Sequence, residues 1–174
     1  AAKDADRPAL FDGITPVATY GDVRSRAFQM AGWMVARGIT PGDRVALLLP
    51  NVPDYLTALF AIWSAGGVAV PINAKLHPKE VAWILENSSA SLCLSQGALL
   101  SALQNQVSCP LADIEAETFA AQSILSPVPR DGTDTAWLFY TSGTTGRSKG
   151  VQLTHRNLIS MSLCYQTDVD AVRP

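Results

Sequence analysis

The sequence predicts an α/β fold, a layered sheet whose parallel strands are joined by helical β-α-β crossovers. Short, continuously apolar runs at residues 44–49, 68–72 and 91–94 have the length of strands, and amphipathic helical segments separate them. Continuous apolarity, as opposed to alternation, is typical of strands that are buried on both faces. Strands that alternate with helices in this way form a parallel sheet with right-handed crossovers.

A helix is expected from about residue 20, before the first of these strands. Thr19 and Asp22 have the spacing of a capping box, with aspartate in place of glutamate. Apolar side chains then recur at helical spacing, at Val23, Ala27, Met30 and Met34. Gly38 stands where such a helix ends.

A second helix is predicted between the first two strands, with Asn51 as its N-cap and Pro53 in its first turn. The stretch between Asp54 and Lys75 carries no charge, and about 20 uncharged residues are enough to span a bilayer. Gly66-Gly67 and Pro71 interrupt this stretch, however. A buried helix followed by a buried strand therefore explains it better than a membrane span.

A third helix is predicted to open at the sequence His77-Pro-Lys-Glu and to bury one face, before the strand at 91–94. Signals are weak from residue 97 to 130, where a Cys109-Pro turn is the clearest feature. The sequence Ser-Pro-Val-Pro-Arg-Asp-Gly from Ser126 indicates a linker. We therefore expect an α/β sub-domain at 1–125, a linker at 126–135 and the start of a second sub-domain at 136–174.

Composition excludes several classes of protein. Hydrophobic residues make up 48% of the 174 residues and charged residues 16%, which indicates a globular chain with much buried surface. The formal net charge is −2 and no run of Lys or Arg is present, so nucleic acid is not an expected partner. Cys93, Cys109 and Cys164 lack the spacing of a metal or disulfide framework, which favours a reducing cytoplasm. Sub-domains that normally pack together leave an apolar face when they are separated, so self-association into a homo-oligomer is also expected.

The segment from Tyr140 to Gly150, Tyr-Thr-Ser-Gly-Thr-Thr-Gly-Arg-Ser-Lys-Gly, carries the clearest functional signal. Strands are predicted on both sides of it, at 136–140 and 150–154, and a helix capped by Thr154 follows. Its hydroxyls, backbone N–H groups and one ammonium indicate a cradle for an anion. It is not a Walker loop, because Lys149 follows a serine and Gly150 replaces the magnesium-binding hydroxyl. A hairpin tip without function remains the alternative, although hairpin loops usually have about two to five residues.

The same segment resembles the phosphate-binding loop of the adenylate-forming superfamily, which includes acyl-CoA synthetases, adenylation domains of peptide synthetases and luciferases. Thr19-Tyr-Gly-Asp-Val resembles the entry to that family's first helix. Trp63-Ser-Ala-Gly-Gly-Val-Ala-Val-Pro-Ile-Asn73 resembles its second core motif, in the same order along the chain. The resemblance implies that the chain is part of the large N-terminal domain of an adenylate-forming enzyme.

The resemblance also implies a ligase reaction in two steps, in which a small-molecule carboxylate reacts with ATP to give an acyl-adenylate and a thiol, usually of coenzyme A, then takes the acyl group. The residues that it assigns to the triphosphate of ATP, with Mg²⁺ sharing the charge, are Thr141, Ser142, Gly143, Thr144, Thr145, Gly146 and Lys149. Lys149 is the expected catalytic residue. Because the family's other functional motifs have no match here, we expect an N-terminal fragment that is inactive alone. A stand-alone nucleotide- or anion-binding module is the alternative.

Other candidates are weaker. His77 and His155 stand at predicted helix starts and read as caps or surface residues, not as general bases. Trp63 and Trp83 lie on apolar helix faces, where they are expected to pack in a core. Cys164 has no histidine nearby in the sequence to activate it as a nucleophile.

Overall fold

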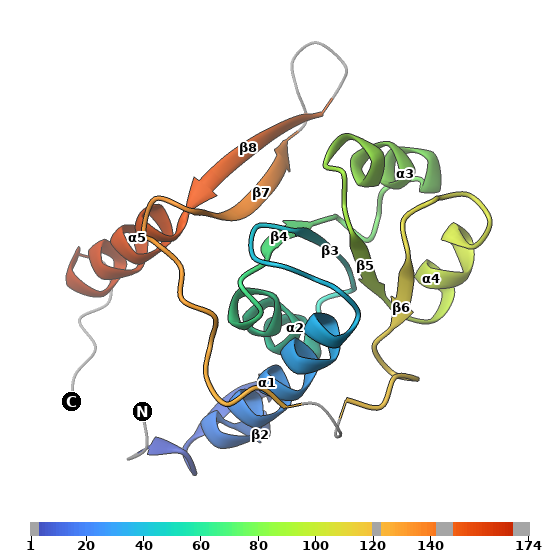
Figure 1. Cartoon of the computed structure of the whole chain (residues 1–174). Coiled ribbons are helices and arrows are strands. Elements are labelled where there is room, and N and C mark those ends of the chain that lie inside the picture. The colour runs from blue at the N-terminus through green and yellow to red at the C-terminus, as the bar shows by residue number, and fades with distance from the viewer. Residues whose placement is uncertain (1–3, 120–122, 142–147, 169–174) are drawn as a thin grey trace.

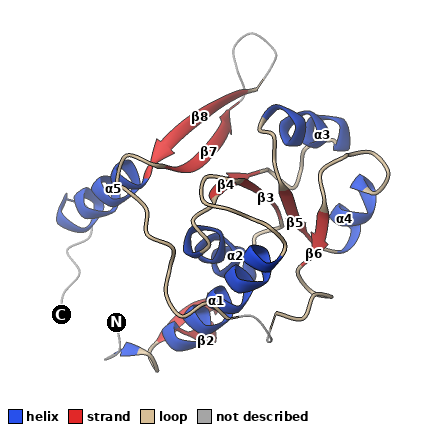
Figure 2. Cartoon of the chain, in the orientation of Figure 1, coloured by secondary structure: helices blue, strands red, loops and turns tan. Residues whose placement is uncertain are grey.

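A six-stranded sheet forms the centre of the molecule (Figures 1 and 2). The computed structural model describes residues 4–119, 123–141 and 148–168. The strand order is β6-β5-β3-β4-β7-β8; every neighbouring pair is parallel except β7 and β8, which are antiparallel. The strands are β3 (Arg44–Leu48), β4 (Val68–Pro71), β5 (Leu92–Ser95), β6 (Leu111–Asp113), β7 (Thr135–Thr141) and β8 (Lys149–Thr154). The predicted α/β class is confirmed.

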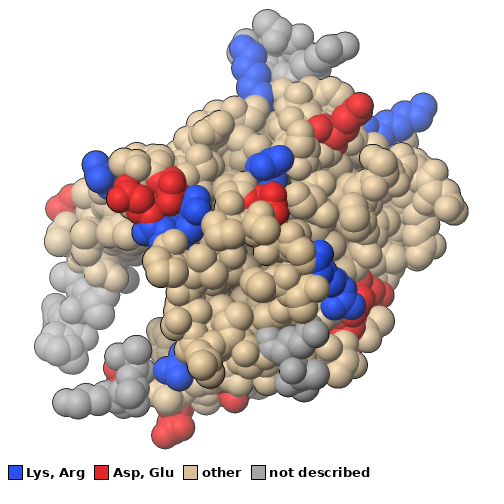
Figure 3. All heavy atoms as spheres, viewed as in Figure 1, with Lys and Arg blue, Asp and Glu red and all other residues tan. Residues whose placement is uncertain are grey.

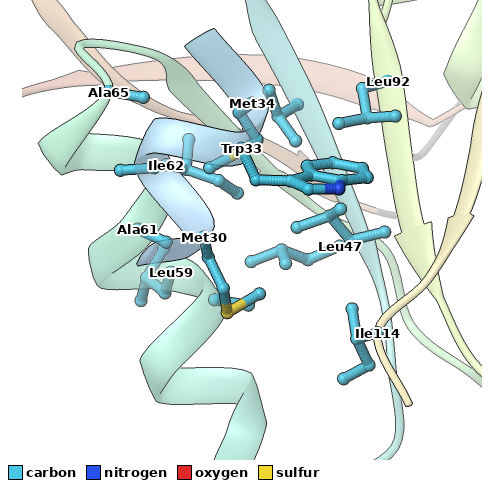
Figure 4. Packing of buried hydrophobic residues seen from close by; sticks show 14 of the residues in the cluster. Met30, Trp33, Met34, Leu47, Leu59, Ala61, Ile62, Ala65, Leu92 and Ile114 are labelled. Carbon is cyan, nitrogen blue, oxygen red and sulfur yellow. The ribbon is translucent and has the colours of Figure 1, made fainter. Parts of the chain in front are cut away.

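Helices cover both faces of the parallel strands, and the central strands β3, β4 and β5 are buried on two sides. α1 (Tyr20–Ala36) and α2 (Pro53–Ser64) pack on one face, against Val45 and Leu47 of β3 (Figure 4). α3 (Pro78–Asn87) and α4 (Gly97–Leu103) lie on the other face, where Ala46 and Leu48 point. The continuous apolar run of β3 is thereby explained, because alternate residues enter two different cores.

Side-chain caps define where most of the helices begin. Thr19 Oγ1 accepts from the N–H of Asp22 at 3.1 Å while Asp22 Oδ2 accepts from the N–H of Thr19 at 2.9 Å, which confirms the predicted capping box. His77 caps α3 in the same reciprocal manner with Glu80. Gly38 follows the end of α1 with φ of 88°, a left-handed conformation that glycine adopts without strain.

The prediction that Asn51 caps α2 is wrong. The N-cap is Val52, which makes no side-chain cap hydrogen bond, and Pro53 lies in the first turn as predicted. Proline has no N–H, so this helix start has one fewer unsatisfied donor and depends less on a capping side chain.

Four short elements were not assigned from the sequence. β1 (Pro8–Asp12) and β2 (Thr15–Thr19) form an antiparallel hairpin outside the main sheet, and α4 and β6 lie in the stretch where sequence signals are weak. Each has at most seven residues, too few for a period to be recognised. β6 owes its strand conformation to pairing with β5, from Cys93↔Leu111 to Ser95↔Asp113.

The final helix, α5 (His155–Asp168), begins at the predicted cap: the N–H of Asn157 donates to Thr154 Oγ1 at 3.2 Å. None of its residues is buried, and several large apolar side chains are exposed, namely Ile159, Met161, Leu163 and Tyr165. The preceding linker lies against α2, where the N–H of Val128 donates to the carbonyl of Ser64. The division into sub-domains at 126–135 stays a prediction.

No helix in the described ranges combines the length and apolarity that crossing a bilayer requires. The uncharged stretch after Asp54 instead forms most of α2 and the strand β4, as predicted. On the face shown in Figure 3, acidic and basic side chains are interspersed among uncharged residues.

Candidate functional site

The predicted anion-binding segment joins the antiparallel strands β7 and β8. The last pair of their ladder is Thr141↔Lys149, preceded by Tyr140↔Gly150. Thr141 and Lys149, two of the predicted site residues, therefore lie directly opposite each other. The others lie outside the described residues, namely Ser142, Gly143, Thr144, Thr145 and Gly146.

The start of this hairpin is anchored to the core by aromatic side chains. The indole N–H of Trp63, on α2, donates to the carbonyl of Ala136 at 2.8 Å. The rings of Trp63 and Trp137 meet edge to face with centroids 6.1 Å apart. Trp63 therefore packs in the core as expected, and it also holds β7 against α2.

A hollow of about 700 Å³ lies at the carboxyl ends of β3, β4 and β7. Most of its lining residues lie at the ends of these strands or directly after them, and one belongs to α2 (Pro53–Ser64); they are Leu49, Pro50, Asn51, Tyr55, Pro71, Ile72, Asn73, Ala74, Lys75, Phe139 and Tyr140. Ligands of α/β proteins bind characteristically at the carboxyl ends of the strands. The ends of the predicted strands are the sequence signal that indicates these positions, since no motif marks them.

The donors around the hollow suit an anionic ligand with an apolar part. Lys75 supplies an ammonium and Asn73 an amide N–H₂, and Asn73 Oδ1 accepts from the N–H of Lys75 at 2.9 Å. Burial raises the pKa of Tyr55, so its hydroxyl stays protonated. No cluster of three acidic, histidine or cysteine side chains occurs in the part of the chain that the structure describes.

The remaining candidates do not form a second reactive centre. Cys93 is buried, and burial raises its pKa well above the ordinary value. Burial also raises the pKa of Cys109, to about 11, so neither thiol is an activated nucleophile. The pKa of His155 is lowered, chiefly by burial and also by Arg130. His155 is the first residue of α5 and is half-buried, and the cap of that helix is Thr154.

Comparison with known proteins gives a consistent result. The chain matches the family model described as AMP-binding enzyme over residues 1–173. It is 39% identical over 154 residues to feruloyl-CoA synthase of an Amycolatopsis species, a match that covers 87% of this chain and 31% of that protein. The chain spans between 2% and 32% of the length of the curated relatives it matches.

Two solved structures extend the comparison to ligands. O-succinylbenzoate CoA synthetase (MenE) from Bacillus subtilis, in complex with the acyl-adenylate OSB-AMP, superimposes with a TM-score of 0.83 at 28% identity. That match covers 95% of this chain and 43% of MenE. ATP-bound MatB from Rhodopseudomonas palustris gives a TM-score of 0.75 at 30% identity, with 85% of this chain and 32% of MatB covered.

Proposed function

Because this chain belongs to the AMP-binding enzyme family, we propose that it holds the triphosphate of ATP in a ligase that joins a carboxylic acid to a thiol through an acyl-adenylate. The observation that carries the proposal is the Thr141↔Lys149 pair, which brings a hydroxyl and an ammonium together at the end of the β7–β8 ladder. Tyr140, the residue before Thr141, lines the hollow at the carboxyl ends of the parallel strands.

The proposed chemistry needs positioning and charge neutralisation more than covalent participation by the protein. A carboxylate oxygen attacks the α-phosphorus of ATP, the bond from that phosphorus to the bridging oxygen breaks, and pyrophosphate leaves with the electron pair. A thiolate then attacks the acyl carbon and AMP departs. Coenzyme A is the proposed thiol, supported by the name of the feruloyl-CoA synthase relative.

Each predicted site residue has a proposed role on the triphosphate. The Lys149 ammonium offsets the charge that accumulates on the departing pyrophosphate, which makes it the proposed catalytic residue. Hydroxyls and backbone N–H groups hold the phosphate oxygens, from Thr141, Ser142, Gly143, Thr144, Thr145 and Gly146. Mg²⁺ would share the phosphate charge when bound.

ATP binding by the 174-residue chain tests the proposal. Calorimetric titration with Mg·ATP is expected to show binding that Lys149→Ala weakens about tenfold, or about 1.4 kcal/mol. Lys149→Arg should retain most of the affinity because it keeps the charge. Lys79→Ala, which removes an exposed ammonium on α3, is the matched control and should change nothing. Equal affinities for Lys149→Ala and wild type would refute the phosphate-binding role.

We also propose that the isolated chain does not complete adenylation, since it spans about a third or less of the curated relatives it matches. Pyrophosphate release with ATP, Mg²⁺ and a panel of carboxylates should stay at background; turnover of about 1 per second or faster would contradict this. In a ligase that contains the chain, Lys149→Ala should lower the adenylation rate more than the ATP affinity, because the ammonium acts most strongly on the transition state.

Two further properties are proposed for the chain. The exposed apolar side chains of α5, such as Ile159 and Leu163, favour self-association, which sedimentation at increasing concentration would detect. The three unpaired cysteines support a location in the reducing cytoplasm.

A further inference from the structure

Tyr140 connects the functional end of the β7–β8 hairpin to α3. Its hydroxyl donates to Oδ1 of Asn87, the last residue of α3, at 2.7 Å. Its ring meets the ring of Trp83, also on α3, edge to face with centroids 6.0 Å apart and an interplanar angle of 87°. Tyr140 immediately precedes Thr141, and Figure 1 shows the hairpin rising beside α3.

The residue opposite Tyr140 leaves room for this arrangement. A Cβ placed on Gly150 would lie 3.2 Å from Cζ of Tyr140 and 3.1 Å from Cδ1 of Leu138. Both distances are shorter than ordinary contacts between carbon atoms. The side chain of any other residue at position 150 would therefore clash with the Tyr140 ring. Burial raises the pKa of Tyr140, and the hydroxyl therefore remains a hydrogen-bond donor at neutral pH.

This end of the hairpin has little other support from the sheet. Among the described residues, the register between β4 and β7 consists of the single pair Ala69↔Trp137. Beyond Trp137, β7 is paired with β8, which is itself an edge strand. The contacts of Tyr140 with α3 therefore hold β7 at a position where it no longer pairs with β4.

We propose that the Tyr140–Asn87 hydrogen bond positions the Thr141↔Lys149 pair for the phosphates of ATP, which makes Tyr140 a positioning residue. This inference rests on the proposed function. A hairpin end that is already held in place loses less conformational entropy when the nucleotide binds. α3 is well situated to hold it, because its N-cap His77 follows the hollow-lining Lys75 by two residues while its last residue binds Tyr140.

The test compares ATP affinity and amide hydrogen exchange in matched variants of the chain. Tyr140→Phe and Asn87→Leu should each weaken ATP binding about two- to tenfold, the range of one net hydrogen bond. Without ATP, both should also speed exchange at the amides of Lys149 and Gly150. Asn87→Asp keeps an acceptor oxygen and should restore the affinity. Tyr165→Phe, on the exposed face of α5, should have no effect.

A double variant tests whether the two residues act as a unit. Tyr140→Phe combined with Asn87→Leu should bind ATP no more weakly than either single variant, because both remove the same hydrogen bond. Additive losses would overturn the inference. Unchanged affinity in both single variants would overturn it as well, even if their melting temperatures fell.

The outcome for Lys149→Ala separates this inference from the proposed function. If Lys149→Ala weakens ATP binding while Tyr140→Phe does not, the phosphate-binding role stands and only the positioning role is refuted. If Lys149→Ala also leaves the affinity unchanged, the proposed function and the inference that rests on it both fail.

Discussion

The guanidinium carbon of Arg37 lies 3.8 Å from the centre of the Trp33 ring, at the C-terminal end of α1. Both side chains also bind Glu117: the indole N–H of Trp33 donates to Oε2 at 3.0 Å, and Arg37 donates to the same oxygen at 3.3 Å. Phe119 completes the group with an edge-to-face contact to Trp33. The segment that follows β6 is thereby held against α1.

Glu117→Ala is expected to lower the free energy of unfolding by about 1–2 kcal/mol, because it leaves the partly buried Trp33 N–H without an acceptor. Glu117→Gln should cost less, since its amide oxygen can still accept from Trp33. Urea denaturation with an unchanged m-value is the measurement. Glu86→Ala, at an exposed position on α3, is the control, and a loss as small as the control's would contradict the prediction.

Gly150→Ala should destabilise the protein by about 1–3 kcal/mol, the usual cost of overpacking. The added methyl group meets Tyr140, whose ring cannot move away without losing its contacts with Asn87 and Trp83. Thermal unfolding is the measurement. Gly132→Ala is the matched control, because its Cβ would meet its nearest neighbour, Arg156, at an ordinary 3.6 Å. Tyr140→Ala should reduce the effect of Gly150→Ala; an unchanged effect would show that the steric account is wrong.

Ser148→Pro is expected to tighten ATP binding by about 0.4–1 kcal/mol if the backbone at this position is compatible with proline. Proline is usual before the lysine in the family that the loop resembles, and it restricts its own φ and the preceding residue. The backbone with proline therefore has less conformational entropy before ATP binds, so it loses less of it on binding. Ser148→Ala leaves the backbone free and should match wild type in calorimetric titrations; weaker binding by Ser148→Pro would show an incompatible backbone.

His155 is expected to make stability depend on pH. Burial is the main cause that lowers its pKa, Arg130 adds to the effect and Asp134 opposes it. As the pH falls below the ordinary value of 6.5, the unfolded state therefore binds more protons than the folded state does. The contribution of neutral His155 to the stability of the fold is fully present above that pH. It should be lost as the pH falls through the lowered folded-state value.

Urea unfolding of wild type and His155→Gln between about pH 5 and 8 measures this contribution. As the pH falls, the free energy of unfolding of wild type should decrease relative to that of His155→Gln. The carboxylates titrate in both proteins, so their effect cancels in the comparison. A difference that stays constant over this range would contradict the prediction.

The elements that could be predicted from the amino-acid sequence are those with local causes. The capping boxes of Thr19 with Asp22 and of His77 with Glu80 join residues three positions apart. The main strands begin and end within one residue of the predicted ranges 44–49, 68–72, 91–94, 136–140 and 150–154. Apolar runs and side-chain caps of this kind act over a single turn or strand, so they can be recognised without knowing the rest of the fold.

The contacts that join distant segments could not be predicted, because they depend on how the whole chain folds. β6 has three residues and is a strand because it pairs with β5, and the hollow exists because three strand ends meet. The loop motif indicated Thr141 and Lys149, but only the ladder register put them opposite each other. Tyr140 and Asn87 are 53 residues apart, and no local pattern pairs them. Their hydrogen bond depends on where the sheet and its crossover helix place two side chains in space.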